Sequence, residues 1–209
     1  MVLFIQVEKL RDFLATMKPL IDAYQQGDYG FSVRALKWLE DAQELMSQLR
    51  LPEGGEMSAL RGQVLKAGDV AQDDDGRRTR AAIRRACSAA AADALQRAEA
   101  VMRSRIQEGE ERLGHFEEKL CEALTAATLV DAFPTPPTQP RQLWLQQVWS
   151  ALSCHQSIRP TTVYLATSLM SSDRLYLLDK IMNRLFQEEM AVIQPKTEAP
   201  AKGKGQARH

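Results

Sequence analysis

The sequence predicts an all-α protein, an elongated helical bundle with a long central coiled-coil-like helix and a smaller C-terminal helical part. Two observations predict this class. The composition is rich in Leu, Ala, Arg, Glu and Gln, and Val, Ile and Thr do not alternate with polar residues as they do in strands. The stretch from Arg77 to Asp131 runs for 55 residues without a proline and is apolar at helical spacing.

The length of this central stretch bears on the shape of the molecule. As one straight helix it would be roughly 80 Å long at about 1.5 Å per residue, whereas a compact chain of this size has a radius of gyration of about 17 Å. We therefore expect an elongated chain, a broken helix or a partner that covers the helix. Gly109 and Gly114 each cost about 1 kcal/mol relative to alanine in a helix, so a continuous helix and a hairpin folded at these glycines both stay open.

Small and apolar residues form a seam along the central stretch, in alternating steps of three and four, as in a coiled coil. Its first part contains ten alanines between Ala81 and Ala100, which let a neighbouring helix approach closely. We expect this seam to contact a protein partner or a second copy of the chain. The residues predicted to bind a partner are Ile83, Ala90, Ala94, Leu113, Phe116 and Leu120, with Trp144 and Trp149 of a later helix.

Charge is unevenly distributed along the same stretch. From Arg77 to Arg105 there are eight arginines against Asp93 and Glu99, a net charge of +6. From Ile106 to Asp131 seven acidic residues face Arg112 and Lys119, a net charge of −5. This polarity opposes the helix macrodipole, so we expect compensation from outside the helix, by an antiparallel second copy or by a fold-back at the glycines; two solvated faces are the simpler alternative.

Residues 1–55 form a predicted helical hairpin, because apolar residues recur at helical spacing on both sides of Gly27-Asp28-Tyr29-Gly30. Pro19 should kink or briefly break the first helix. The second helix should run from Phe31 to Leu49 and end at Pro52. Residues 23–29 resemble the inter-helix turn of a tetratricopeptide repeat, and residues 35–45 resemble its second helix. This resemblance covers one hairpin without a copy about 34 residues away, and it implies no binding residues.

Residues 56–133 form the second predicted segment, which holds a short helix, an acidic loop and the long helix. The short helix should span Ser58 to Ala67, with Ser58 as its cap and Gly68 closing it. Asp73 to Asp75 are interpreted as caps that offset the neighbouring arginines. A calcium loop of the EF-hand type is excluded, because its first and twelfth positions would be Ala71 and Ala82.

The remaining segments follow from proline content and composition. Residues 134–140 are a predicted Pro-rich linker. Residues 141–194 should form C-terminal helices, with a break at Arg159-Pro160 and a final helix capped by residues 171–173. Three short helices bury too little apolar surface by themselves, so we expect them to dock on the first hairpin or on a partner. Residues 195–209 are a predicted disordered basic tail.

No motif predicts catalysis or a cofactor site. His115, His155 and His209 are scattered, and the phosphate-loop, dinucleotide and zinc-protease motifs are missing from the sequence. Glu108, Glu111, His115 and Glu118 share one helix face, but they lack the Glu-x-x-His spacing of di-iron bundles. We interpret them as a solvated face and expect no catalytic residue, metal, cofactor or small-molecule substrate.

Net charge, cysteine content and hydropathy limit the partners and the cellular location that the chain can have. The chain has 27 basic and 27 acidic residues, which argues against a dedicated polyanion-binding protein. Its three cysteines imply no disulfide framework. No apolar run reaches the length of a membrane span, and the N-terminus lacks the pattern of a signal peptide. We expect a cytoplasmic protein without a membrane role.

These observations predict a non-enzymatic helical adaptor or scaffold protein that acts through helix–helix contacts. The alternative is a small helical subunit of a nucleic-acid-handling complex. Its phosphate contacts would come from an arginine cluster in which no aromatic residue is interleaved for base stacking. The residues of this cluster are Arg77, Arg78, Arg80, Arg84 and Arg85.

Overall fold

The computed structural model describes residues 2–71, 76, 77, 79–128 and 140–193, and side chains as far as Leu185. Within these ranges the fold is all-α. The helices are α1 (Leu3–Ala15), α2 (Lys18–Gln25), α3 (Phe31–Gln48), α4 (Gly54–Val70), α5 (Arg80–Thr128), α6 (Arg141–Cys154), α7 (Arg159–Ser168) and α8 (Ser171–Ile193).

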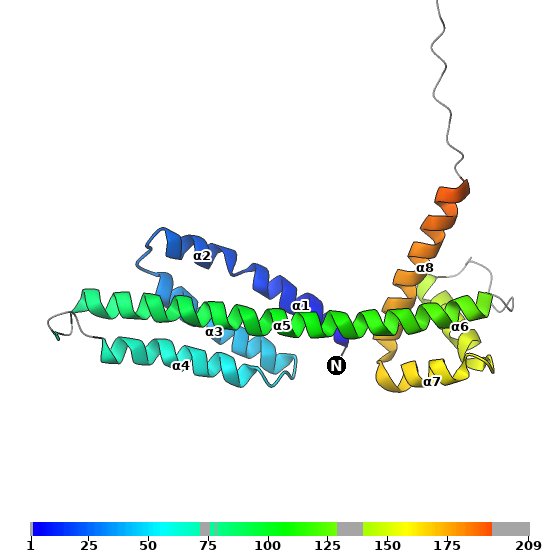
Figure 1. The fold of residues 1–209 in the computed structure, drawn as a ribbon, viewed down its shortest axis with the longest axis horizontal. Helices are drawn as coiled ribbons and strands as arrows, with labels where there is room; N and C mark the ends of the chain where they lie inside the picture. Colours follow the sequence, from blue (N-terminus) through cyan, green and yellow to red (C-terminus); the bar gives the residue numbers. More distant parts are fainter. Residues whose placement is uncertain (1, 72–75, 78, 129–139, 194–209) are drawn as a thin grey trace, which may run out of the picture.

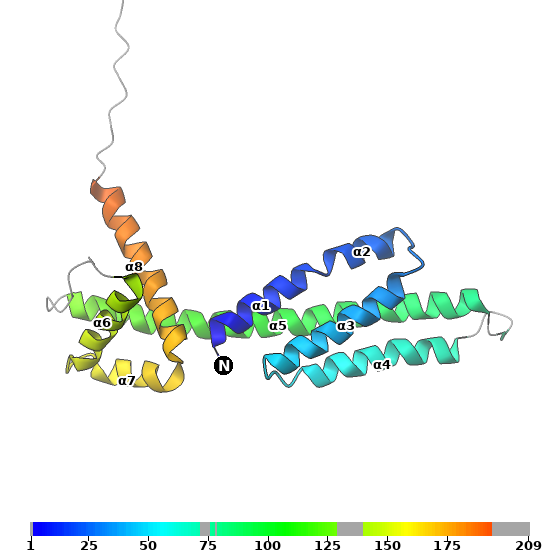
Figure 2. The same ribbon diagram turned by 180° about the vertical axis from the view of Figure 1, so that it is seen from behind.

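Helix α5 is the spine of an elongated molecule (Figure 1). It has 49 residues and is unbroken, so the chain does not fold back at Gly109 and Gly114. Helices α1, α3 and α4 cover its first part, α2 packs on α3, and helices α6–α8 cover its last part, as the view from behind also shows (Figure 2). Of the three arrangements expected for so long a helix, the chain adopts the elongated one and covers the helix with its own segments.

The alanine-rich part of α5 lies in the first of two hydrophobic cores. Ala91, Ala94 and Ala98 are fully or almost fully buried there among residues of α1, α3 and α4. Because an alanine side chain is a single methyl group, the neighbouring helices pack close to the α5 backbone. The close neighbour expected from the sequence is therefore supplied by the chain itself.

The second core contains the last part of α5 together with α6, α7 and α8. Phe116, Leu120 and Leu124 of α5 are buried among Trp144, Leu178 and other apolar residues. The C-terminal helices thus dock on α5, which the sequence did not suggest, and α8 also contacts α1 of the first hairpin, as it did suggest. Leu113 is half-buried and packs against both cores, which makes it the point where the two bundles meet.

The helix break and the turn in the N-terminal segment lie where the sequence predicted them. Helix α1 ends at Ala15 and α2 begins at Lys18, with Pro19 in its first turn, as expected of a residue that cannot donate a helical hydrogen bond. The Trp38 indole N–H of α3 donates to the Thr16 hydroxyl at 2.9 Å and fastens this break. The turn before α3 has Gly27 at φ +66°, a conformation that glycine adopts without strain.

The bounds of α4 correct the sequence analysis. The helix begins at Gly54, so Ser58 is not its cap, and it continues through Gly68 to Val70. Packing explains the early start, because Gly54 is buried and a side chain there would meet Met46 of α3. The expected roles of Asp73 to Asp75, the linker 134–140 and the tail 195–209 lie outside the described residues.

Candidate functional site

Among the described residues, no group of three His, Cys, Asp or Glu side chains is placed to hold a metal ion. The acidic face of α5 is engaged by its own neighbours. Glu108 accepts a hydrogen bond from Arg105 at 2.9 Å, and Glu111 accepts one from Gln107 at 2.9 Å. These two carboxylates therefore form surface pairs along the helix.

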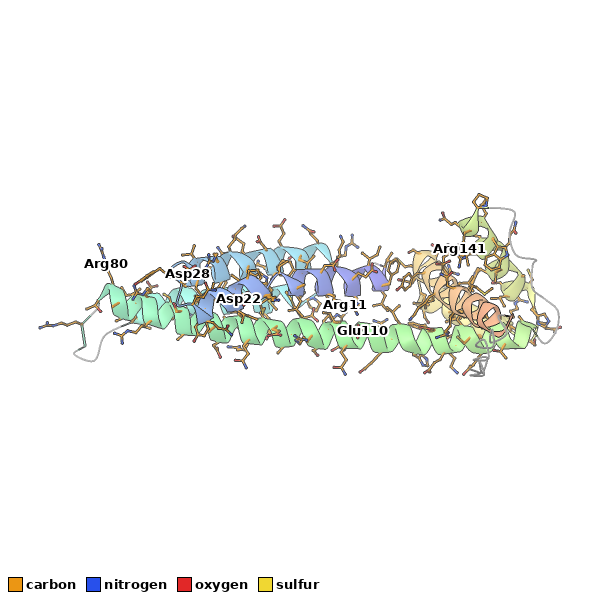
Figure 3. All side chains as sticks on the ribbon, turned by 90° about the horizontal axis from the view of Figure 1, so that it is seen from above. Arg11, Asp22, Asp28, Arg80, Glu110 and Arg141 are labelled. Atoms are coloured by element: carbon orange, nitrogen blue, oxygen red, sulfur yellow. The ribbon has the colours of Figure 1, made fainter. Side chains whose placement is uncertain are left out.

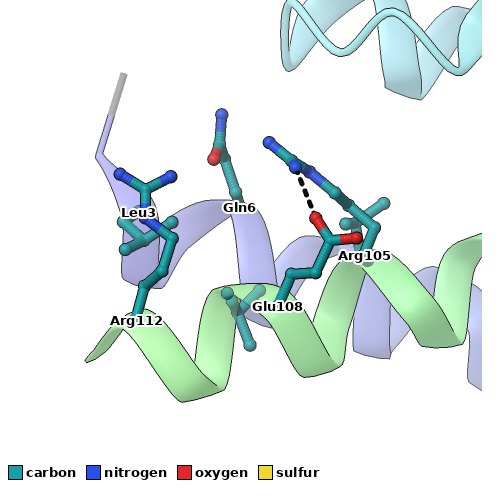
Figure 4. A pocket seen from close by; sticks show the side chains of 8 residues that line it. Leu3, Gln6, Arg105, Glu108 and Arg112 are labelled. Carbon is teal, nitrogen blue, oxygen red and sulfur yellow. Dashed lines mark hydrogen bonds and ion pairs between the residues drawn. The ribbon is translucent and has the colours of Figure 1, made fainter. Parts of the chain in front are cut away.

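A small, partly open cavity lies between α1 and α5. Leu3 and Gln6 line it from α1, and Arg105, Glu108 and Arg112 line it from α5 (Figure 4). Its volume is about 10 Å³, close to the space of a single water molecule. The cavity is therefore too small for a metabolite or a cofactor.

The residues predicted to bind a partner lie mostly inside the chain's own cores. Ala94 is buried in the first core, and Phe116, Leu120 and Trp144 are buried in the second. Ile83, Ala90, Leu113 and Trp149 are half-buried. The seam of α5 is thus in contact with α1, α3 and α4 along its first part and with α6–α8 along its last part.

Trp149 is the member of this set beside an open hollow between α6 and α8. Gln142, Gln146 and Ser150 line the hollow from α6, and α8 contributes Arg174. The Arg174 guanidinium carbon lies 4.8 Å from the centre of the Trp149 ring, a cation–π contact. This hollow leaves Trp149 open to a partner more than the buried Trp144.

The two bundles are joined by contacts between α1 and α8. Asp173, in the first turn of α8, is buried, and its carboxylate accepts hydrogen bonds from the backbone N–H groups of Leu3 at 3.0 Å and Phe4 at 3.1 Å. Val2, the N-cap residue of α1, cannot make this bond. Asp173 therefore caps α1 from 170 residues away, although the sequence suggested that it caps its own helix.

A ring stack extends this contact between α1 and α8, and ion pairs link each of the two helices to α5. Phe4 and Tyr176 stack with centroids 4.2 Å apart. Arg11 of α1 pairs with Glu110 of α5 near the middle of the rod (Figure 3). Glu117 of α5 accepts from Lys180 at 2.7 Å and lies 3.2 Å from Arg184, both on α8. We define the hydrogen bonds of Asp173 to Leu3 and Phe4 and the Phe4–Tyr176 stack as the α1–α8 junction.

The ion pairs of α1 and α8 with α5 offset part of the charge asymmetry of α5. The acidic second half receives arginines and a lysine from α1 and α8, so compensation comes from other segments of the same chain. In the basic first half, Arg105 lies 3.9 Å from Glu53 and Arg97 donates to Gln63 at 2.8 Å. The fold-back expected as one route to compensation is not formed.

The arginine cluster lies at the end of the rod where α5 begins. Arg80, Arg84 and Arg85 are exposed, as is Arg77, and Arg78 lies outside the described residues. Figure 3 shows Arg80 at this end of the molecule, and Asp28 of the α2–α3 turn lies toward the same end. The Arg84 guanidinium carbon lies 4.4 Å from the centre of the Tyr29 ring. The structure thus places an aromatic ring beside the cluster, which sequence reasoning missed because Tyr29 is 55 residues from Arg84.

Large apolar side chains are exposed around the same turn. Tyr29 has 75% of its surface exposed, Val33 has 68%, and Tyr24 has 49%. Tyr24 also contacts the buried Phe31, with ring centroids 5.0 Å apart. We define the Arg–Tyr end as the surface formed by Tyr24, Tyr29, Val33, Arg80, Arg84 and Arg85.

No described helix is long and apolar enough to cross a membrane. No family model, curated protein or solved structure matches the chain. The resemblance of residues 23–29 to a tetratricopeptide-repeat turn therefore gains no support from these comparisons.

Proposed function

We propose that the chain is a non-enzymatic helical adaptor that holds two partner-binding surfaces at a fixed separation. The observation that carries the proposal is that α5 runs without interruption through both hydrophobic cores. A shared helix of 49 residues would be about 74 Å long. It therefore sets the distance between whatever binds the two bundles.

The two surfaces proposed for binding lie at opposite parts of the rod. One is the Arg–Tyr end, and the other is the Trp149 hollow between α6 and α8. Tyr, Trp and Arg are the residue types most often found at binding hot spots. One surface combines Tyr29 with Arg84, and the other combines Trp149 with Arg174. The α1–α8 junction supports the fixed separation, because it ties the two bundles together beside α5.

A pull-down from the native cell tests the adaptor directly. We expect the wild-type chain to recover two sets of partners together. Trp149→Ala should lose one set and Tyr29→Ala with Arg84→Gln should lose the other, because each change removes one surface. If either variant loses both sets of partners, or if neither variant loses a set, the proposal of two independent surfaces is contradicted.

The fixed separation is tested by a distance measurement between spin labels. Leu65→Cys and Val163→Cys place labels on exposed positions of the two bundles, in a chain whose natural cysteines are replaced by serine. We expect one narrow distance distribution. A broad distribution for this otherwise unaltered chain would show that the bundles move independently and would end the proposal of a fixed spacer.

The second candidate is the nucleic-acid subunit, and the contact between Tyr29 and Arg84 favours it, since stacking rings beside cations are typical of single-strand binding. Replacing Arg77, Arg78, Arg80, Arg84 and Arg85 with glutamine should abolish retention on a polyanion column at about 50 mM salt, where phosphate contacts are strong. A wild-type chain that is not retained would exclude this function.

A further inference from the structure

The Arg–Tyr end carries positive charge that the described part of the chain does not neutralise. Arg80, Arg84 and Arg85 form no ion pair with any described residue, whereas Arg11, Arg34 and other arginines do. They also stand in the first two turns of α5, where the helix macrodipole adds positive potential. This end therefore attracts an anionic group.

The same surface exposes apolar area that water solvates poorly. Val33 and Tyr29 are among the most exposed large apolar side chains of the described residues. The Arg84 guanidinium lies over the Tyr29 ring, 4.4 Å from its centre, so the ring and the charge are neighbours on this surface. A partner that covers both must bring apolar side chains as well as negative charge.

We propose that the Arg–Tyr end binds an acidic amphipathic helix of a partner protein, whose apolar side chains cover Tyr29 and Val33 and whose carboxylates pair with Arg80, Arg84 and Arg85. This inference names the partner class for one of the two surfaces of the proposed adaptor and so rests on that function. Carboxylates bind guanidinium groups with paired hydrogen bonds, and amphipathic helices commonly dock by their apolar faces.

A nucleic acid fits this surface less well than an acidic helix. The aliphatic Val33 side chain cannot stack on a base, and the carboxylate of Asp28 lies at the same end (Figure 3). The Gly30 N–H and Arg34 hold the pKa of Asp28 below its ordinary value, and the ion pair with Arg34 at 2.6 Å offsets its charge. The preference for an acidic helix therefore rests on Val33, which an apolar side chain of a partner helix can cover and a phosphate backbone cannot.

The probe is a designed, dye-labelled peptide with glutamate on one helix face and leucine on the other. It has about 15 residues, because shorter isolated helices are only marginally stable in water. A second peptide replaces glutamate with lysine, a third replaces leucine with serine, and an oligo-dT of about 15 nucleotides represents nucleic acid. Fluorescence anisotropy with the full chain measures binding. We expect the glutamate–leucine peptide to bind at least about tenfold more tightly than the other three probes.

Variants locate the binding surface. Tyr29→Ala with Arg84→Gln should weaken the glutamate–leucine peptide at least about tenfold. Arg103→Gln with Tyr164→Ala is the matched control, because it also removes an exposed arginine and an exposed tyrosine, but away from the Arg–Tyr end. Circular dichroism should show the same helix content in all three proteins, since the substituted side chains are exposed.

Each of four outcomes would overturn the proposal. In the first, oligo-dT binds more tightly than any peptide, and in the second the glutamate and lysine peptides bind equally tightly. In the third, the control variant weakens the glutamate–leucine peptide as much as the Tyr29 and Arg84 variant does. In the fourth, this peptide binds only after Asp73 to Asp75 are replaced with asparagine. The last outcome would identify the chain's own aspartates as the occupant. The spin-label distance does not depend on this surface, so it separates failure of this inference from failure of the fixed spacer.

Discussion

At the scale of single residues, Gly109 has a packing role that its low helix propensity conceals. A side-chain carbon at Gly109 would lie 2.5 Å from Val7 Cγ2 of α1, and Val7 is buried and stiff about its first torsion. We expect Gly109→Ala to destabilise the fold by about 1–3 kcal/mol, the cost of overpacking, less the gain of up to about 1 kcal/mol in helix propensity. Urea unfolding measures the difference.

Gly114 is the matched control for that change. Nothing lies within 4 Å of a side-chain carbon built there, so Gly114→Ala should stabilise the fold by up to about 1 kcal/mol. A Gly109→Ala protein as stable as Gly114→Ala would show that α1 does not approach α5 closely. Val7→Ala should in turn remove most of the penalty of Gly109→Ala.

Asp173 carries a second residue-scale prediction. Asp173→Ala removes the acceptor for the N–H groups of Leu3 and Phe4, so we expect a loss of about 1–2 kcal/mol, as for other N-caps. Hydrogen exchange should accelerate in the first turn of α1, which is distant in sequence from the substitution. The exposed Asp93→Ala is the control, and unchanged exchange in α1 would refute the interbundle cap.

At the scale of the element, the alanines of α5 divide into a buried face and an exposed face. Ala98 is fully buried in the first core, and Ala100, two residues on, is exposed. We expect Ala98→Leu to cost about 1–3 kcal/mol because the added carbons have no space, and Ala100→Leu to change the free energy of unfolding by less than about 0.5 kcal/mol. Equal effects would mean that this seam does not face α1, α3 and α4.

At the scale of the whole molecule, the uninterrupted helix α5 predicts an elongated shape in solution. Small-angle scattering should give a radius of gyration well above the value of about 17 Å expected for a compact chain of this length. Sedimentation at low and high salt tests self-association. A mass that doubles only at low salt would place a second copy along the charged faces of α5, whereas a salt-insensitive monomer would remove charge pairing between copies.

The sequence by itself determined the all-α class, the long central helix, the break at Pro19 and the turn at Gly27, because helical periodicity, proline geometry and glycine conformation are local properties. It also placed the seam of α5 correctly, since the spacing of Phe116 and Leu120 fixes which face is apolar.

Only the tertiary structure decided what covers that seam, that α5 continues through Gly109, and that Asp173 caps α1. It also brought Tyr29 to Arg84 across 55 residues of sequence. These features depend on contacts between residues far apart in the chain, and the local spacing of side chains carries no information about which distant helix completes a contact.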